Sequence, residues 1–566
     1  MSGVASPGAA GGLPRLAWPA QGLARAMDCP QCGAGGEKPL LVTVAWHTRD
    51  NPDRCNAVLA CPACGAAFYD DRTPPDYTDP NIAADGRAAF YLQQGTGLWH
   101  SAGLLARVPR PPGARYLEVG CGPGFGLDFA IHGLGWQGHG FDPSPIAEAG
   151  RKRLFLPITR DYFRGSASGA FDVLMAAEVI EHVPSPRAFL LMLRNSLAAD
   201  GILVLTTPDA AAIRPQTSSG ALVPLLSPGL HLILQSQASL ARLLAECGFG
   251  HVTIERDSFS LIAFASRTPF ALRPDRTEAR ARYRNWLRGR AAHFAQDPVL
   301  QLAFAGHALL ESVNDADFAT ARAVMPLLTR CLAQHFGIAI DSPLPLPAAI
   351  HRAALPAIAA LMPFNLPAIL YARAIMRVLE GEPRAAVRPL FAAAAEAAGA
   401  LRGALAAAML EDGETEDLAW VAAAEALLCD AETDAAGLLA GLAQLPPAPG
   451  EGPAAPSGRR RDIMRRALTG LVNKGHYTSA RALVRAEALD HDTDTPLTPV
   501  ARDALFALAI LDSQPGGDPA RARARFARVR ASLEAAGATE SGLYRACLNG
   551  EALAARSAGP VEPRRA

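Results

Sequence analysis

A glycine-rich turn after a short apolar stretch is the feature that most constrains the fold of this 566-residue chain. Residues 116–126 read YLEVGCGPGFG, with glycines at 120, 122 and 124. Glycine lets the backbone turn sharply and come close to a ligand. Residues 127–131 are suited to open a helix whose amide groups point back at the turn. We therefore expect a strand, a nucleotide-cradling loop and a helix in succession. Such glycine triplets also form turns with a purely structural role, so the sequence after residue 126 has to show whether this one binds a ligand.

The downstream sequence alternates between strand and helix patterns. Strands are expected at 138–141, 156–159, 171–176, 201–206, 251–255 and 260–265, and helices at 145–152, 187–197 and 238–247. Alternation of this kind predicts a doubly wound α/β sheet that binds its ligand at the carboxyl ends of the strands.

Asp142 ends the second strand, 22 residues after Gly120. An acid at this position is placed to hydrogen-bond the two hydroxyls of a ribose, and the alternative is an aspartate in a solvated turn. Pro123 removes an amide that the pyrophosphate of a dinucleotide would use. The loop therefore favours a nucleoside cofactor without a pyrophosphate.

Five motifs resemble, in order and spacing, those of class I S-adenosylmethionine-dependent methyltransferases over about residues 114–265. They are Glu118-x-Gly120-x-Gly122-x-Gly124, Gly140-Phe141-Asp142, Phe171-Asp172-Val173-Leu174, Glu178-Val179-Ile180-Glu181-His182-Val183 and Leu197-Ala198-Ala199-Asp200-Gly201. The resemblance implies a Rossmann-like, seven-stranded domain with S-adenosylmethionine as its cofactor. Asp200-Gly201 stands where that family usually has a proline-glycine turn.

The resemblance also implies which residues meet the cofactor. In that family the glycine loop holds the methionine end, the acid after the second strand binds the ribose, and a polar residue after the third strand meets the adenine amine. The cofactor-binding candidates by motif match are Glu118, Gly120, Cys121, Gly122, Gly124, Asp142, Asp161 and Glu178.

Methyl transfer needs few catalytic groups. A sulfonium methyl is already activated, so the protein mainly has to hold an acceptor in line with the C–S bond. A general base is needed only for a hydroxyl or a carbon acid. The candidates are Glu178, Glu181 and His182 after the fourth strand, and His231 in the segment that faces the acceptor. The alternatives are that Glu181 and His182 hold the loop and the cofactor in place, and that His231 is structural.

Two C-x-x-C pairs near the start of the chain predict a metal site. Cys29 and Cys32 are separated from Cys61 and Cys64 by 28 residues, and a glycine follows each pair. Four thiolates match the tetrahedral preference of Zn²⁺ and leave no position for a catalytic water. We predict a structural zinc ribbon over 28–72, with strands near 40–45 and 57–60. Redox dithiols are the alternative, and Cys55 and His47 are expected to be bystanders.

Composition limits the partners. The chain has 54 basic and 54 acidic residues, which gives no argument for nucleic acid or an anionic membrane. Residues 1–27 lack the pattern of a signal peptide and are expected to be a disordered leader, so we expect a cytoplasmic protein. The uncharged run 353–372 contains three prolines, and we expect a buried helical hairpin there and no membrane span.

A helical lead-in is expected over 73–113, with one helix at 83–108. Its aromatic residues are expected either to line a substrate pocket or to pack the lead-in against the core. They are Tyr77, Phe90, Tyr91 and Trp99.

The remainder, after a methyltransferase domain at 114–268, reads as helical. We expect helices over 269–444, a proline-rich linker at 445–458, a tetratricopeptide-like region over 459–556 and a disordered tail at 557–566. Three stretches, which begin at Gly381, Gly475 and Gly517, resemble the second helix of such a repeat, although Glu487 breaks the apolar face of the second. The region is a candidate surface for a protein partner.

The sequence thus predicts three regions: a zinc ribbon, an α/β methyltransferase domain and an all-α C-terminal region. A zinc ribbon before such a domain resembles bacterial methyltransferases of sugars or cell-surface glycans, which implies a small-molecule or carbohydrate acceptor. The alternative is an inactive, methyltransferase-like scaffold whose helical region binds a protein.

Overall fold

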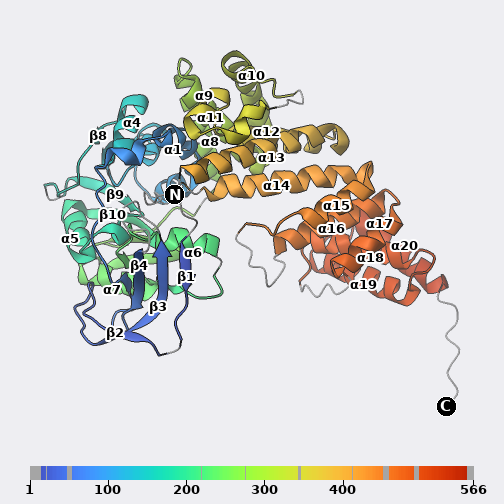
Figure 1. The fold of residues 1–566 in the computed structure, drawn as a ribbon, viewed down its shortest axis with the longest axis horizontal. Helices are drawn as coiled ribbons and strands as arrows, with labels where there is room; N and C mark the ends of the chain where they lie inside the picture. The colour runs from blue at the N-terminus through green and yellow to red at the C-terminus, as the bar shows by residue number, and fades with distance from the viewer. Residues whose placement is uncertain are drawn as a thin grey trace. The chain divides into compact units, whose positions relative to one another are not determined.

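The computed structural model in Figure 1 divides the chain into two compact units. Unit 1 comprises residues 1–372 and 396–416, and unit 2 comprises 373–395 and 417–566. The described residues are 14–20, 22–46, 54–167, 169–217, 219–274, 276–341, 346–408, 410, 412–449, 458–489 and 496–557. His47 lies outside them.

A seven-stranded sheet forms the centre of unit 1. Its strand order is β12-β13-β10-β9-β6-β7-β8. The strands are β6 (Arg115–Val119), β7 (Gln137–Phe141), β8 (Ile158–Thr159), β9 (Phe171–Ala177), β10 (Leu197–Pro208), β12 (His251–Asp257) and β13 (Ser260–Ser266). The first five pair in parallel, whereas β13 is antiparallel to both β10 and β12. The predicted α/β fold class is confirmed.

Serine caps start three of the four helices that connect these strands. The helices are α3 (Phe125–Asp128), α4 (Pro145–Leu154), α5 (Pro186–Ser196) and α7 (Gln237–Glu246), and a single π-helical turn, 129–133, follows α3. The hydroxyls of Ser144 and Ser185 each accept a hydrogen bond from an amide in the first turn of their helix, which a proline opens. Ser236 and Ser239 form a reciprocal capping box at α7.

A second sheet carries the cysteine pairs. It contains β1 (Arg15–Ala17), β2 (Ala24–Ala26), β3 (Glu37–Trp46), β4 (Arg54–Ala60), β5 (Ala67–Tyr69) and β11 (Ile233–Leu234). The predicted leader, 1–27, therefore contains two strands instead of only disorder, because β1 and β2 both pair with β3. Strand β11 comes from the methyltransferase-like region and pairs with β5, so the two sheets are joined by the chain.

The lead-in contains two α-helices where one was expected. They are α1 (Arg87–Gln94) and α2 (Trp99–Arg107), with a 3-10 turn over 95–97 between them. At Gly97 an added Cβ would lie 2.6 Å from the His307 ring. The backbone therefore approaches a neighbouring helix closely where the sequence pattern suggested one continuous helix.

Three helices after the expected boundary at 268 belong to the same unit. They are α8 (Arg276–His293), α9 (Pro298–Asn314) and α10 (Phe318–Phe336). The buried carboxylate of Asp128, just after the glycine loop, accepts a hydrogen bond from Trp286 at 2.7 Å and pairs with Arg290 at 2.7 Å. Helix α8 is therefore part of the support for the loop.

The apolar run 353–372 forms α11 (Leu355–Leu361) and α12 (Leu366–Leu379), which meet at a bend of 45° where a hairpin was expected. Proline at the start of each helix allows a bend without reversal of the chain. Within the described residues, only α13 (Arg384–Ala407) is by itself long and apolar enough to cross a membrane, and 56% of its apolar window is buried.

Helices α12, α13 and α14 (Gly413–Cys429) contribute to both units, and the helices that lie in unit 2 alone follow them. These are α15 (Ala435–Gln444), α16 (Gly458–Asn473), α17 (Tyr477–Ala486), α18 (Pro499–Asp512), α19 (Pro519–Ala535) and α20 (Gly542–Ser557). They share one apolar core, which includes Leu445 and Ala448 from the expected linker.

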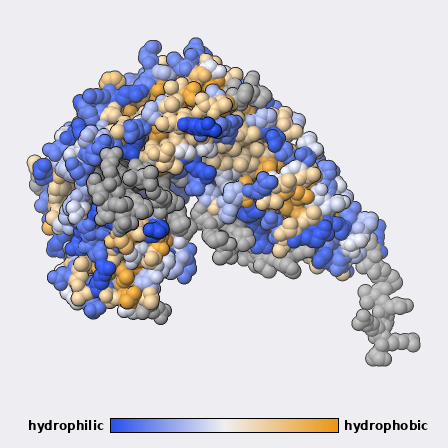
Figure 2. Space-filling model, in the orientation of Figure 1, coloured by the Kyte–Doolittle hydropathy of each residue, from blue (hydrophilic) through white to orange (hydrophobic). Residues whose placement is uncertain are grey.

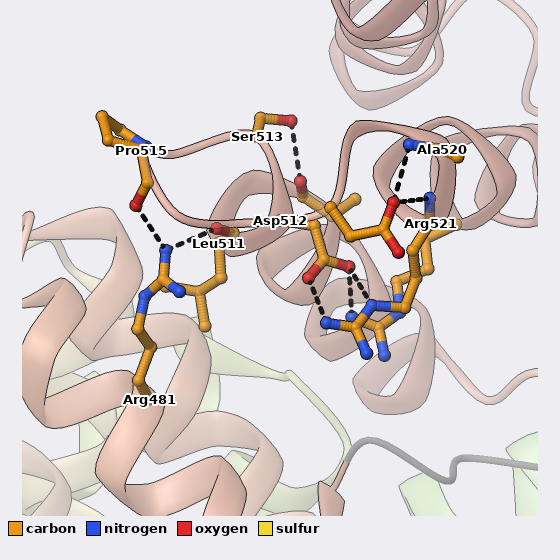
Figure 3. Close-up of polar contacts among 10 residues, drawn as sticks. Arg481, Leu511, Asp512, Ser513, Pro515, Ala520 and Arg521 are labelled. Carbon is orange, nitrogen blue, oxygen red and sulfur yellow. Dashed lines mark hydrogen bonds and ion pairs between the residues drawn. The ribbon is translucent and has the colours of Figure 1, made fainter. Parts of the chain in front are cut away.

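Arginine side chains stabilise turns in unit 2 through hydrogen bonds. Figure 3 shows Arg481, which donates to the carbonyl oxygens of Leu511 at 3.0 Å and Pro515 at 3.4 Å. Asp512 accepts from Arg521 at 2.9 Å, so these arginines partly close helix ends. On the face shown in Figure 2, hydrophilic and hydrophobic residues are interspersed.

The three repeat-like stretches each place a helix directly after a glycine turn, at α13, α17 and α19. Ala480 and Ala522 are buried, whereas Ala386 is exposed. Tetratricopeptide character stays a prediction.

Candidate methyl-transfer site

A cavity of about 700 Å³ lies at the carboxyl ends of β6, β7 and β9. This size is in the range of pockets that hold small molecules and cofactors. Its lining includes Gly120 and Gly122 of the loop, Asp142 after β7, and Glu178 after β9. The carboxyl edge of the parallel strands thus brings together predicted residues that are distant in the sequence.

The three loop glycines all have positive φ, at +73° for Gly120, +51° for Gly122 and +89° for Gly124. An added Cβ at Gly120 would lie 2.5 Å from the Val179 side chain, whereas at Gly122 it would meet nothing within 4 Å. Gly122 therefore presents bare backbone to the cavity, and Gly120 is required for packing. The loop offers the open cradle that a ligand backbone contact needs.

Asp142 is held by two amides. Its Oδ2 accepts from the Gly122 amide at 2.9 Å, and its Oδ1 accepts from the Ser144 amide at 2.8 Å. A carboxylate oxygen can accept more than one hydrogen bond, so both oxygens can still accept from a vicinal diol. These contacts orient the carboxylate on the cavity wall beside the loop.

Three of the predicted cofactor residues are placed behind the wall. Glu118, Cys121 and Gly124 are not among the described residues that line the cavity. Glu118 is buried under the loop and accepts a hydrogen bond from Tyr116 at 3.0 Å. Burial raises the pKa of Glu118 to about 8, so its carboxyl is protonated at neutral pH.

Asp161 lines the same cavity after β8 and is half-exposed. Phe163 beside it is buried, and its ring lies 5.1 Å from the Phe141 ring. Tyr162, which also lines the cavity, is 44% exposed. This part of the cavity combines aromatic rings with one carboxylate, a combination suited to a purine.

The other wall carries Glu178, His182 and His231. Glu178 has φ +53°, which is strained for a side chain other than glycine. The His182 and His231 rings meet edge to face, with centroids 4.7 Å apart. Glu181 is fully buried behind them, with its Oε1 3.7 Å from His182 Nε2 and 3.9 Å from His231 Nε2. All four predicted catalytic residues are thus brought together.

Burial is the main cause of the shifted pKa values on this wall. It lowers the pKa of His182 to about 4 and that of His231 well below its usual range. It raises the pKa of Glu181 well above its usual range, and the neighbouring Glu178 carboxyl adds to this. Both imidazoles are therefore neutral at neutral pH.

The lead-in aromatics divide between the two roles considered for them. Tyr77 and Tyr91 line the cavity. Phe90 is buried against Phe364, with ring centroids 5.6 Å apart, and Trp99 packs on Tyr283 at 5.4 Å.

The Tyr77 hydroxyl lies 2.6 Å from His182 Nδ1, a contact that sequence reasoning missed. Thr207, at the end of β10, was also missed, and its hydroxyl donates to Glu181 Oε2 at 3.0 Å. Tyr77 and His182 are 105 residues apart, and no spacing rule links them. A polar residue at the carboxyl end of a parallel strand was the available signal for Thr207.

The four predicted cysteines converge at one end of the second sheet. Their sulfur atoms all lie within 4.8 Å of one another, with 3.7 Å from Cys29 to Cys64 and from Cys32 to Cys61. Four sulfurs held about 2.3 Å from one tetrahedral ion would be roughly 3.8 Å apart, so the cluster fits Zn²⁺. The close Cys64 thiol lowers the pKa of Cys29 to about 4. Cys55 is exposed and lies outside the cluster.

The cysteine-bearing sheet is attached to the cavity wall. Leu232 lies between His231 and β11, and its carbonyl oxygen accepts from the Tyr69 amide at 3.1 Å. The Tyr69 hydroxyl donates to the Leu226 carbonyl oxygen at 3.0 Å. The chain on both sides of His231 is therefore held by β5.

Comparison with known proteins identifies the central region. Residues 97–254 match the family described as "Methyltransferase domain". The "Ubiquinone biosynthesis O-methyltransferase, mitochondrial" of Schizosaccharomyces pombe is 37% identical over 105 residues, which are 17% of this chain and 38% of that protein. The "Ubiquinone biosynthesis O-methyltransferase" of a Caulobacter species is 32% identical over 104 residues, 17% of this chain and 41% of that protein.

The "Trans-aconitate 2-methyltransferase" of Methylobacterium nodulans is 33% identical over 131 residues, which are 22% of this chain and 51% of that protein. The chain thus spans about half or less of the length of these curated relatives. The family match covers the glycine loop, Asp142 and the Glu178–His231 wall. Residues 97–254 are a class I S-adenosylmethionine-dependent methyltransferase domain.

Proposed function

We propose that this protein transfers a methyl group from S-adenosylmethionine to a hydroxyl oxygen of a small molecule. The observation that carries the proposal is one cavity with two chemically different walls. The glycine loop and Asp142 form one wall, and Glu178, His182 and His231 form the other. A donor and an acceptor can therefore meet within one cavity.

The cofactor wall has groups that fit each part of S-adenosylmethionine. The Asp142 carboxylate would hold the ribose diol, because its two oxygens are fixed by the Gly122 and Ser144 amides. Asp161 and the ring of Phe163 would receive the adenine, and the open backbone at Gly122 leaves room for the methionine end. Bound S-adenosylmethionine supplies an activated methyl group.

The acceptor wall favours a compact molecule of low polarity. Pro74, Pro75 and Leu225 line this cavity together with Tyr77 and Phe259. Apolar lining stabilises an apolar acceptor more than a polyhydroxylated one, because sugar hydroxyls would lose hydration without enough partners. An aromatic or alicyclic hydroxyl compound therefore fits better than a carbohydrate. Two of the relatives described above carry O-methyltransferase in their names.

His182 would orient the acceptor hydroxyl. It lines the cavity, and its ring is fixed by contacts of Nδ1 with Tyr77 and the Leu230 carbonyl. Since burial lowers the pKa of His182 to about 4, the ring is neutral and can accept a hydrogen bond. Positioning of this kind is the main contribution that methyl transfer requires from a protein.

Calorimetric titration with S-adenosylmethionine tests the cofactor wall. We expect the wild-type protein to bind and Asp142→Asn to bind about 10- to 100-fold more weakly, the loss expected for charge-assisted hydrogen bonds. Asp200→Asn is the matched control, because Asp200 is 63% exposed and pairs with Arg110 away from the cavity. Absence of binding by the wild-type protein would refute the proposal.

Labelled methyl transfer to a panel of compounds tests the acceptor class. The panel contains phenols, alicyclic alcohols and monosaccharides of similar size. Label in phenols or alicyclic alcohols supports the low-polarity acceptor, whereas label only in monosaccharides favours the carbohydrate acceptor. Protein binding by unit 2 and a cytoplasmic location remain predictions.

A further inference from the structure

We propose that Glu181, His182 and His231 form a binding site for a divalent transition-metal ion of the Zn²⁺ class on the acceptor wall of the cavity. One carboxylate and two imidazoles are a donor set that such ions bind in proteins. This site is separate from the four-cysteine cluster. The donors come from two segments, the turn after β9 and the loop before β11.

The three donor atoms surround a space of the right size. One donor atom from each of Glu181, His182 and His231 lies within 4.8 Å of the other two. The separations from Glu181 Oε1, 3.7 Å and 3.9 Å, are too long for hydrogen bonds. Donors about 2.0–2.2 Å from one ion are roughly 3–4 Å apart, so shifts below about 1 Å would complete the site.

The tautomer of His231 leaves its donor atom free. His231 Nδ1 lies 2.8 Å from the Leu225 carbonyl oxygen. A carbonyl oxygen only accepts, so the proton of the neutral ring is on Nδ1 and the lone pair of Nε2 faces Glu181. Metal-binding histidines are commonly oriented in this way by a backbone carbonyl.

His182 has a similar arrangement. Its Nδ1 lies 3.1 Å from the Leu230 carbonyl oxygen and 2.6 Å from the Tyr77 hydroxyl. A proton on Nδ1 satisfies the Leu230 carbonyl and leaves Nε2 as an acceptor toward Glu181. Both rings therefore direct lone pairs to the same side.

Glu181 supplies an independent sign that a cation is required. Its side chain is fully buried, and its Oε1 has no hydrogen-bond partner among the described residues. Thr207 satisfies only Oε2. A buried carboxyl oxygen without a partner is costly, and a divalent ion that displaces the carboxyl proton would compensate it.

The ion would act on the hydroxyl of the methyl acceptor, a role that rests on the proposed function. His182 and His231 line the cavity, so with the ion bound its open coordination positions, in place of His182 Nε2, would face the acceptor hydroxyl. With Nδ1 directed to the Leu230 carbonyl and Nε2 on the ion, His182 has no lone pair left to take the proton of a hydroxyl. A hydroxyl beside a divalent cation loses its proton more readily. That proton would leave to solvent as the O–C bond forms and the C–S bond breaks, with the C–S electron pair retained by sulfur.

Metal stoichiometry tests the site directly. The full-length protein is loaded with Zn²⁺, freed of unbound metal and analysed for zinc per chain. We expect two equivalents in the wild-type protein and one in His231→Asn. Asparagine places an amide nitrogen near the position of Nδ1, so the bond to Leu225 is kept while Nε2 is lost. His351→Asn, at a half-exposed histidine of a short 3-10 turn, is the control and should keep two.

Cobalt loading separates the two sites. In His231→Asn the thiolate-to-cobalt absorption of the cysteine cluster should remain, whereas in Cys29→Ser it should be lost and the second equivalent kept. One equivalent of metal per chain in the wild-type protein, or two in His231→Asn, would overturn the proposal. S-adenosylmethionine titration of the same samples reports folding and the cofactor site. Two equivalents without cofactor binding would sink the proposed function while leaving the metal site supported.

Discussion

The indole ring of Trp46 lies against Gly229, where an added Cβ would fall 2.2 Å from Cη2 of the ring. Trp46 ends β3 of the cysteine-bearing sheet, and Gly229 precedes His231 by two residues. Gly229 also has φ +84°. The position of the acceptor wall therefore depends on a side chain from the N-terminal sheet.

Gly229→Ala should displace this loop. We expect a loss of about 2–5 kcal/mol in the free energy of unfolding, from the left-handed backbone together with overpacking against Trp46. Acceptor methylation should fall at least tenfold, whereas binding of S-adenosylmethionine should change little, because the cofactor wall lies on other strands. Denaturant unfolding and calorimetry measure the two effects.

Gly337→Ala is the matched control for Gly229→Ala. Gly337 has φ +66° at the end of α10, and an added Cβ there meets nothing within 4 Å. It should cost only about 1–2 kcal/mol. Equal destabilisation by both variants would show that Trp46 does not constrain the loop.

Glu118→Gln should change the response of the protein to alkaline pH. The folded-state pKa of Glu118 is raised from 4.5 to about 8 by burial, so its contribution to stability is present at low pH and is lost as pH rises toward 8. Glutamine mimics the protonated carboxyl, so the variant should match the wild type at acidic pH and unfold at higher denaturant concentration at pH 9. Glu246→Gln, at an exposed ion pair with Arg187, is the control and should leave the pH profile unchanged.

The pair Asp128–Arg290 should behave as a buried ion pair. Arg290→Met leaves the Asp128 carboxylate without its cation and should cost about 3–5 kcal/mol. Asp128→Asn combined with Arg290→Met should cost clearly less, because no charge remains buried. A double-mutant cycle by denaturant unfolding gives the coupling energy. Strict additivity would contradict a coupling between Asp128 and Arg290.

His307→Leu should remove part of the acid sensitivity. Burial lowers the pKa of His307 from 6.5 to about 4, and its Nε2 has no hydrogen-bond partner in the described part of the chain. The unfolded chain binds a proton near pH 6.5 while the folded chain does not, so the free energy of unfolding falls as pH drops from 6.5 to 4. Denaturant unfolding at pH 7 and pH 5 should show a smaller decrease for the variant. An unchanged decrease would assign the sensitivity to other groups.

The methyltransferase domain and the cysteine cluster could be predicted from the sequence, because short sequence motifs indicate each of them. The strand before Gly120, the acid after the second strand and the cysteine spacing each depend on a few adjacent residues. The strands of the first 27 residues could not be predicted, because they are short and exist only through pairing with β3. Helices α8 to α10 were separated from the domain for a similar reason, since helical periodicity does not say against which surface a helix packs.

The acceptor wall shows the same limit at the level of single side chains. Motif spacing brought Glu178, Glu181 and His182 together, and position along the chain suggested His231. The contacts that orient these groups involve Tyr77, Thr207 and backbone carbonyls. Such contacts arise from tertiary packing and leave no periodic pattern in the sequence.

The pairing of β5 with β11 has a consequence for how the chain unfolds. The cysteine-bearing sheet takes its last strand from a segment 164 residues after β5, since Ile233 pairs with Phe68 and Leu234 with Ala67. The cysteine-bearing sheet therefore cannot lose this edge strand without displacing the chain next to His231. Amides of β5 and β11 should exchange with solvent at one common rate, and a chain that begins after residue 72 would expose a bare strand edge prone to self-association.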